Sequence, residues 1–171
     1  KLLFRICYLI SLMFSNIIFA QWSTDPNFNN PICTGNGIQY RLSQVTDGAG
    51  GSVMVWTDNR NGNADIYAQR ISANGYPMWG TNGIVICNAA DTQDFPTIIA
   101  SDLNSVIIAW IDLRTGIDYN IYAQKISLVG TTLWTGNGVP ICTSPSDQIE
   151  PSLADDGFGG AYLAWTDARF G

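Results

Sequence analysis

Three copies of one short motif bring Asp and Arg side chains together at a fixed spacing. Trp56-Thr-Asp-Asn-Arg60 returns as Trp110-Ile-Asp-Leu-Arg114 and as Trp165-Thr-Asp-Ala-Arg169, at spacings of 54 and 55 residues. A Gln recurs with the same period before each motif. Loops on a rigid scaffold carry most of the residues that bind ligands. The candidate ligand-binding residues are therefore Asp58, Arg60, Gln93, Asp112, Arg114, Gln148, Glu150, Asp167 and Arg169.

The same motif has a structural interpretation. Side chains two residues apart on a strand point to the same side, so Asp58 and Arg60 can form an ion pair within their own unit. A residue that recurs in every unit holds the unit together more often than it recognises an asymmetric ligand. We favour the structural role for the motif and keep ligand recognition as the alternative.

The loop from Asp58 to Asp65 also places Asp, Asn and Gly at alternating positions, as calcium loops do. The second copy replaces oxygen donors with Leu113 and Ile117, and Arg60 itself occupies a would-be ligand position. We therefore expect no metal ion and no other cofactor.

The residue types that are present restrict catalysis. The chain has no His, which excludes a Ser-His-Asp triad, a His-based zinc site and imidazole general-base chemistry within these residues. Its single Glu, Glu150, stands where the second repeat has Phe95 and the first has Arg41. An active site must break the symmetry of a repeat, so Glu150 is the carboxylate to test first, although we assign no catalytic residue.

The N-terminus predicts export. Lys1 and Arg5 flank an apolar run from Ile6 to Phe19, and Ala20 precedes Gln21, which is the pattern of a signal peptide over residues 1–20 and is short for a membrane span. From Gln21 onwards the chain carries 6 Lys and Arg (8 minus Lys1 and Arg5) against 14 Asp and Glu, a formal charge of −8. We expect a secreted or cell-surface protein with no membrane span after cleavage, and this charge argues against nucleic acid as a partner.

The cysteines follow the period as well, since Cys33, Cys87 and Cys142 lie 54 and 55 residues apart. Equivalent positions in stacked sheets lie about 10 Å apart, whereas a disulfide needs Cα atoms within about 7 Å. We expect buried apolar thiols, one per repeat, although the sequence leaves their redox state open.

The apolar runs within one repeat predict an all-β fold. In the second repeat, apolar runs at Thr97–Ala100, Val106–Trp110 and Ile121–Ile126 are followed by a fourth that opens at Leu133-Trp134 and reaches Cys142, each bounded by Gly, Asn, Asp or Pro. The second run of every repeat, Val53–Trp56, Ile107–Trp110 and Tyr162–Trp165, is apolar at consecutive positions, which predicts burial on both faces. A four-stranded antiparallel sheet covered on both sides by similar sheets is a β-propeller blade.

We therefore predict β-propeller repeats over residues 21–171, in units of about 22–78, 79–133 and an incomplete 134–171. A β-solenoid has a shorter period and a β-sandwich a longer unit. Because a closed propeller has about four to eight blades, we expect an incomplete propeller whose remaining blades lie elsewhere in a longer protein, with self-association of short chains as the alternative. The loops that carry the candidate residues should share one rim.

At these residues the chain resembles the repeat of large secreted bacterial propeller proteins, which are similar to sialidase-type propellers. The resemblance rests on Asp-Gly-x-Gly-Gly, Trp-x-Asp-x-Arg-x-Gly and Asp-Ile-Tyr-Ala-Gln-Arg-Ile (Asp65 to Ile71), and it covers nearly all of residues 31 to 170. It implies a non-catalytic exported module that binds a glycan or a protein, or serves as a scaffold. A sialidase-like glycoside hydrolase whose catalytic residues lie mainly in other blades is the alternative, but no Asp-box is intact here.

Overall fold

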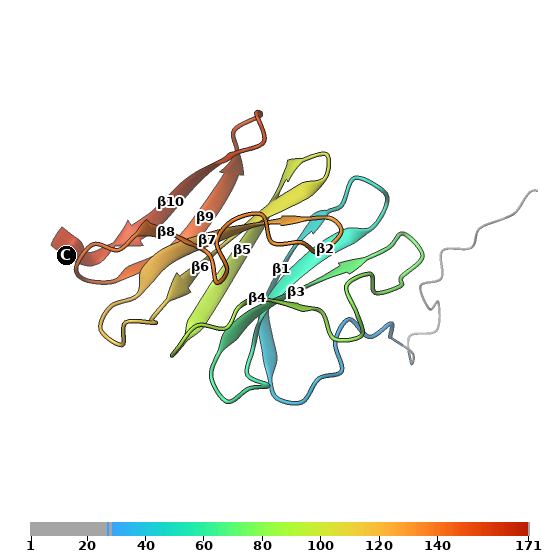
Figure 1. Ribbon diagram of the computed structural model, residues 1–171, viewed down its shortest axis with the longest axis horizontal. Helices are drawn as coiled ribbons and strands as arrows, with labels where there is room; N and C mark the ends of the chain where they lie inside the picture. The colour runs from blue at the N-terminus through green and yellow to red at the C-terminus, as the bar shows by residue number, and fades with distance from the viewer. Residues whose placement is uncertain (1–26, 28, 171) are drawn as a thin grey trace, which may run out of the picture.

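The computed structural model describes residue 27 and residues 29–170, and it is built from antiparallel β-sheets (Figure 1). The expected signal peptide lies outside these residues. The first sheet contains β1 (Gln39–Thr46), β2 (Ser52–Asp58), β3 (Asp65–Ile71) and β4 (Ile84–Cys87), and the second contains β5 (Gln93–Asp102), β6 (Ser105–Asp112), β7 (Asn120–Ser127) and β8 (Val139–Cys142). The third consists of β9 (Gln148–Asp155) and β10 (Ala161–Asp167), followed by the 3-10 turn η1 (Ala168–Phe170). The all-β prediction is confirmed.

Strand order in each sheet follows chain order, and each strand is antiparallel to the next. The hairpin between β1 and β2 forms because Asp47 ties the loop to itself: its Oδ1 accepts the backbone N–H groups of Ala49 and Gly51, both at 2.8 Å. Asp156 accepts those of Phe158 and Gly160 in the same way between β9 and β10. These Asp-Gly-x-Gly-Gly loops are the tight connections that the sequence predicts.

The sheets pack face to face in chain order, with β5 against β1 and β2, and with β9 against β5 and β6 (Figure 1). One apolar core cluster joins Val53 and Val55 of β2 to Val106, Ile108 and Trp110 of β6. The second sheet lies between its two neighbours, so every residue of β6 is buried. The predicted burial of both faces is therefore confirmed for β6.

The burial of β10 differs from that of β6. The predicted burial of both faces is wrong for β10, where half-buried and exposed positions alternate, because its sheet is covered on one face by the second sheet within the described residues. Tyr162 is 69% exposed, whereas Ile107, its counterpart in β6, is 3% exposed. Within the described residues β10 also has a strand on one side alone, whereas β6 lies between β5 and β7, so the difference in burial comes from the neighbouring strands and sheets and not from the strand itself.

One strand boundary was wrong. We expected the fourth strand to open at Leu133-Trp134, but β8 begins at Val139. The backbone N–H of Trp134 donates to Oε1 of Gln124 on β7 at 3.1 Å. This segment is therefore a turn fixed to the third strand of its sheet. The predicted unit boundaries after residues 78 and 133 fall in the β3–β4 and β7–β8 connections, and the sheets themselves span 39–87 and 93–142.

Candidate functional site

The Trp-x-Asp-x-Arg motif forms a buried polar cluster at the end of the second strand. Asp58 is fully buried, and its Oδ2 accepts the indole N–H of Trp56 at 2.8 Å. Its Oδ1 accepts both Nε–H and the backbone N–H of Arg60 at 2.9 Å. Both carboxylate oxygens are therefore occupied by donors of the same motif.

The second and third copies repeat this geometry. Asp112 accepts the Trp110 indole N–H at 2.9 Å and Arg114 Nε–H at 2.8 Å, and Asp167 accepts Arg169 Nε–H at 2.9 Å. The ion pair of the structural interpretation, which we favoured, is thus present in all three copies. A calcium ion would need the same oxygens.

Arg60 and Arg114 each connect several segments of their sheet. The Arg60 guanidinium lies 4.0 Å from the ring centroid of Tyr67 on β3 and donates to the Asn82 carbonyl at 3.1 Å. Arg114 does the same with Tyr122 at 3.8 Å and with the carbonyl of Asn137 at 2.8 Å. The guanidinium therefore connects the second strand to the third and to the loop before the fourth.

The cysteines complete this cluster from the neighbouring unit. Arg114 Nη2 donates to Sγ of Cys87 at 3.4 Å, although Cys87 ends β4 of the preceding sheet. Arg60 donates in the same way to Sγ of Cys33 at 3.0 Å. Cys33, Cys87 and Cys142 are free thiols, and burial raises the pKa of Cys87 to about 12. The predicted burial is confirmed for Cys87 and wrong for Cys33 and Cys142, which are half-buried, and the sequence missed the contact of Cys87 with Arg114.

The carboxylates of Asp58 and Asp167 are held in their charged form. Burial acts to raise the pKa of Asp58, but the hydrogen bonds from Arg60 and Trp56 outweigh it and keep that pKa below its usual value. The hydrogen bond from Arg169 lowers the pKa of Asp167 to about 2. Neither carboxyl group is poised to give or take a proton near neutral pH.

The predicted glutamines lie opposite these aspartates in the strand pairing of their sheets. Strand pairing puts Gln93 opposite Asp112 and Gln148 opposite Asp167. Both glutamines are fully buried, and their amide N–H groups donate to carbonyls of the preceding connection, Ala90 at 2.9 Å and Ser146 at 2.6 Å. Each glutamine therefore fixes the connection that leads into its own strand, β5 or β9.

A second set of equivalent positions has a different character. Arg41, Phe95 and Glu150 occupy the same place in β1, β5 and β9, two residues after each glutamine, and their φ angles are 54°, 54° and 57°. Each stands at an irregularity in the pairing with the second strand, as in a β-bulge. A non-Gly residue in the left-handed region costs stability, and such residues cluster at ligand sites and bulges that redirect a side chain.

These three side chains line one hollow of about 340 Å³, which we call the bulge hollow. Leu42, Pro96, Thr97 and Pro151 complete its lining. The guanidinium carbon of Arg41 lies 3.3 Å from the centroid of Phe95, and its Nε lies 3.2 Å from Oδ1 of Asp94. Oε2 of Glu150 accepts the hydroxyl of Thr166 at 3.0 Å.

Of the residues that line the bulge hollow, Glu150 alone was among the candidate residues predicted from the sequence. The signal for the other two was present in the sequence, because unlike residues at an equivalent repeat position mark the place where the repeats differ. What the sequence did not reveal is that the three side chains meet. The first strands of successive sheets lie against each other, and the bulges turn these side chains towards a shared hollow.

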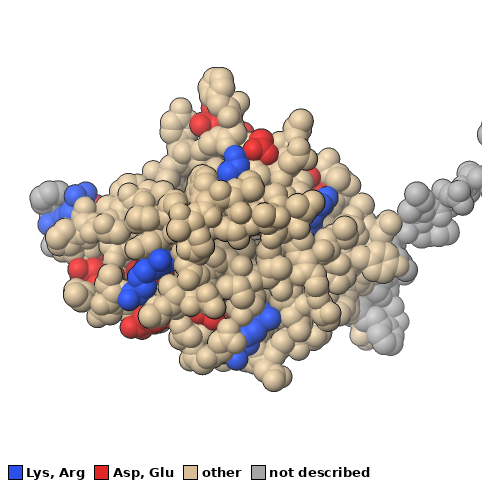
Figure 2. Space-filling view, in the orientation of Figure 1, with Lys and Arg blue, Asp and Glu red and all other residues tan. Residues whose placement is uncertain are grey.

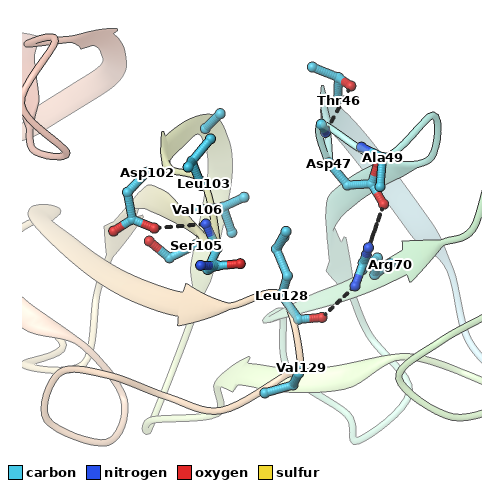
Figure 3. Close-up of a pocket in the computed structure, with 13 residues that line it drawn as sticks. Thr46, Asp47, Ala49, Arg70, Asp102, Leu103, Ser105, Val106, Leu128 and Val129 are labelled. Atoms are coloured by element: carbon cyan, nitrogen blue, oxygen red, sulfur yellow. Dashed lines mark hydrogen bonds and ion pairs between the residues drawn. The ribbon is translucent and has the colours of Figure 1, made fainter.

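Another hollow, of about 420 Å³, lies at the opposite strand ends between the β1–β2 and β5–β6 hairpins (Figure 3). Its charged groups are engaged in fixing one sheet to the next. Arg70 pairs with Asp47 at 2.8 Å and also donates to the carbonyl of Leu128, beyond β7 of the second sheet, at 3.0 Å. This hollow is an inter-sheet joint, and the bulge hollow is the better candidate site.

The charged side chains on the face shown in Figure 2 are sparse and scattered and form no basic patch. Among the described residues, no helix has both the length and the apolar character that a membrane crossing requires. Comparisons of the chain with protein-family models, with curated proteins and with solved structures found no match.

Proposed function

We propose that the sheets are blades of a β-propeller and that the protein is an exported, non-catalytic binding module of a bacterial surface or secreted protein. The support for the architecture is the repetition of one contact. The first sheet meets the second through the same faces and the same first strands with which the second meets the third. Four antiparallel strands in chain order, stacked on like sheets, are the parts from which a propeller is made.

The observation that supports the binding function is that the two sets of repeated positions differ: one set is used within the fold and the other lines a hollow. Among the residues that recur unchanged, Asp58 accepts hydrogen bonds on both carboxylate oxygens, and Gln93 donates its amide N–H within the fold while its buried Oε1 has no hydrogen-bond partner. The positions that vary, Arg41, Phe95 and Glu150, have left-handed backbone and share a hollow. A ligand of the proposed module, a glycan or a protein segment, would contact the varied positions.

Glycine substitution at the left-handed positions tests this proposal, because glycine removes the side chain without a φ penalty. The purified protein is assayed against immobilised 3′-sialyllactose, neutral oligosaccharides and short peptides of acidic, neutral and basic composition. We expect binding to at least one probe, lost in Phe95→Gly and retained in the matched control Ser146→Gly, which also has positive φ. Binding to none of the probes, or equal loss in both variants, would refute the assignment.

The hydrolase alternative has its own test in the same hollow. Glu150 is exposed there and is the single Glu of the chain. A retaining glycosidase needs a carboxylate or equivalent nucleophile close to an acid. If the protein hydrolysed a fluorogenic sialoside and Glu150→Gln abolished the reaction, the non-catalytic proposal would be wrong.

A further inference from the structure

We propose that the bulge hollow binds the cationic side chain of a basic peptide segment, an Arg or Lys, against Phe95 and Glu150. This rests on the proposed binding function and names the ligand class for it.

The first argument is the charge left over at the hollow. The guanidinium of Arg41 is paired with Asp94, which also accepts the backbone N–H of Phe95 at 2.8 Å. The remaining charge is the carboxylate of Glu150, which accepts one hydroxyl. A carboxylate has about four acceptor positions, so further donors can be accommodated. The chain as a whole carries a net charge of −6, which attracts cations over a longer range.

The second argument is that the hollow offers few donors besides the guanidinium of Arg41, which is paired with Asp94. Residues 96 and 151, which directly follow two of the left-handed positions, are prolines and have no N–H group. The Thr166 hydroxyl donates to Glu150, and the N–H of Phe95 is already used. An anionic ligand, such as a carboxylate sugar or a phosphate, needs several donors. A cation brings its own.

The third argument is the shape and surface of the site. Phe95 is 41% exposed and already carries one guanidinium on its ring, which shows that the ring is placed for cation–π contact. Leu42, Pro96 and Pro151 offer apolar surface for the aliphatic stem of an Arg or Lys. A volume of about 340 Å³ is at the small end of ligand pockets and suits one or two side chains.

The test uses fluorescein-labelled Gly-Ser peptides that contain two Arg, two Lys, two Gln or two Glu, with 3′-sialyllactose as a competitor. Fluorescence anisotropy with the purified protein should show binding of the Arg and Lys peptides and not of the Glu peptide. Glu150→Gln removes the charged acceptor and should weaken the Kd for the Arg peptide about tenfold. Phe95→Leu keeps an apolar side chain without the ring and should weaken it several-fold.

Asp155→Asn is the matched control, because it removes the same charge from an exposed residue at the opposite end of β9. Its Kd should stay within twofold of the parent value. Equal weakening by Asp155→Asn and Glu150→Gln would mean unspecific charge attraction and would overturn the inference. If sialyllactose or a neutral sugar bound through Phe95 and the basic peptides did not, the binding function would stand and this ligand class would be wrong.

Discussion

Asp112→Ala should destabilise the protein more than any change at the exposed copy of the same motif. Asp112 is fully buried and accepts four hydrogen bonds from its own motif, one from Trp110 and three from Arg114. Its removal leaves a largely buried guanidinium and an indole N–H without their acceptor. Breaking one partner of a buried ion pair costs about 3–5 kcal/mol, against a total stability of about 5–15 kcal/mol for a domain.

The measurement is urea unfolding followed by tryptophan fluorescence and circular dichroism. With a slope of about 1–3 kcal/mol per molar urea, the midpoint should fall by about 1–5 M. Asp167→Ala is the matched control, because this side chain is 21% exposed and its Arg169 partner 40% exposed, so solvent screens the pair and replaces its hydrogen bonds. The expected loss there is much smaller.

If Asp112→Ala does not fold, Asp112→Asn provides the measurement, since it keeps the shape and one acceptor but removes the charge. Equal midpoints for the variants at Asp112 and Asp167 would refute the reasoning, because burial is what separates the two copies. A large loss at Asp167 with none at Asp112 would refute it as well.

Three further predictions address the backbone, pH dependence and thiol reactivity. Gly138→Ala should destabilise the protein by more than about 1 kcal/mol, because φ is +85° and the added Cβ would lie 2.5 Å from the Trp110 ring. The control Gly136→Ala, whose Cβ would have nothing within 4 Å, should leave the midpoint of the same urea titration unchanged. The pKa of Asp167 is about 2, so its contribution is present above the unfolded pKa of about 4 and is lost as the pH falls through about 2; the urea midpoints of the parent and Asp167→Asn should differ at pH 5 and converge near pH 2. Cys87 should react with a thiol reagent at pH 8 only on unfolding, since its pKa is about 12 and it is buried, whereas the two half-buried cysteines should react first; equal rates would contradict the packing.

Much of the fold was accessible from the sequence because its signals are local. Apolar runs, turn residues and a period of 54–55 residues depend on neighbours in the chain, and they correctly predicted an all-β chain with strands near Val106–Trp110 and Ile121–Ile126. The consecutive apolar residues of the second strand correctly predicted its burial in the second sheet. The start of the fourth strand was missed because a tryptophan in a turn looks like a strand residue until its partner, Gln124, is known.

The role of each polar residue was decided by contacts between distant segments. The sequence alone left Asp58 and Arg60 open between ligand binding and an ion pair. The structure shows their ion pair, seated on Tyr67 and completed by Cys33, 27 residues before Arg60. Periodicity identifies equivalent positions, but it carries no information on which donor meets which acceptor.

The sequence by itself determined the repeating β-architecture, the residues that recur and the residues that vary. Only the tertiary structure decided that the recurring Asp and Arg are used inside the fold and that Arg41, Phe95 and Glu150 meet at one hollow. The physical reason is that a strand's pattern depends on its own residues, whereas a site depends on how separate strands pack. The bulges that aim these three side chains arise from pairing between strands, which no single segment specifies.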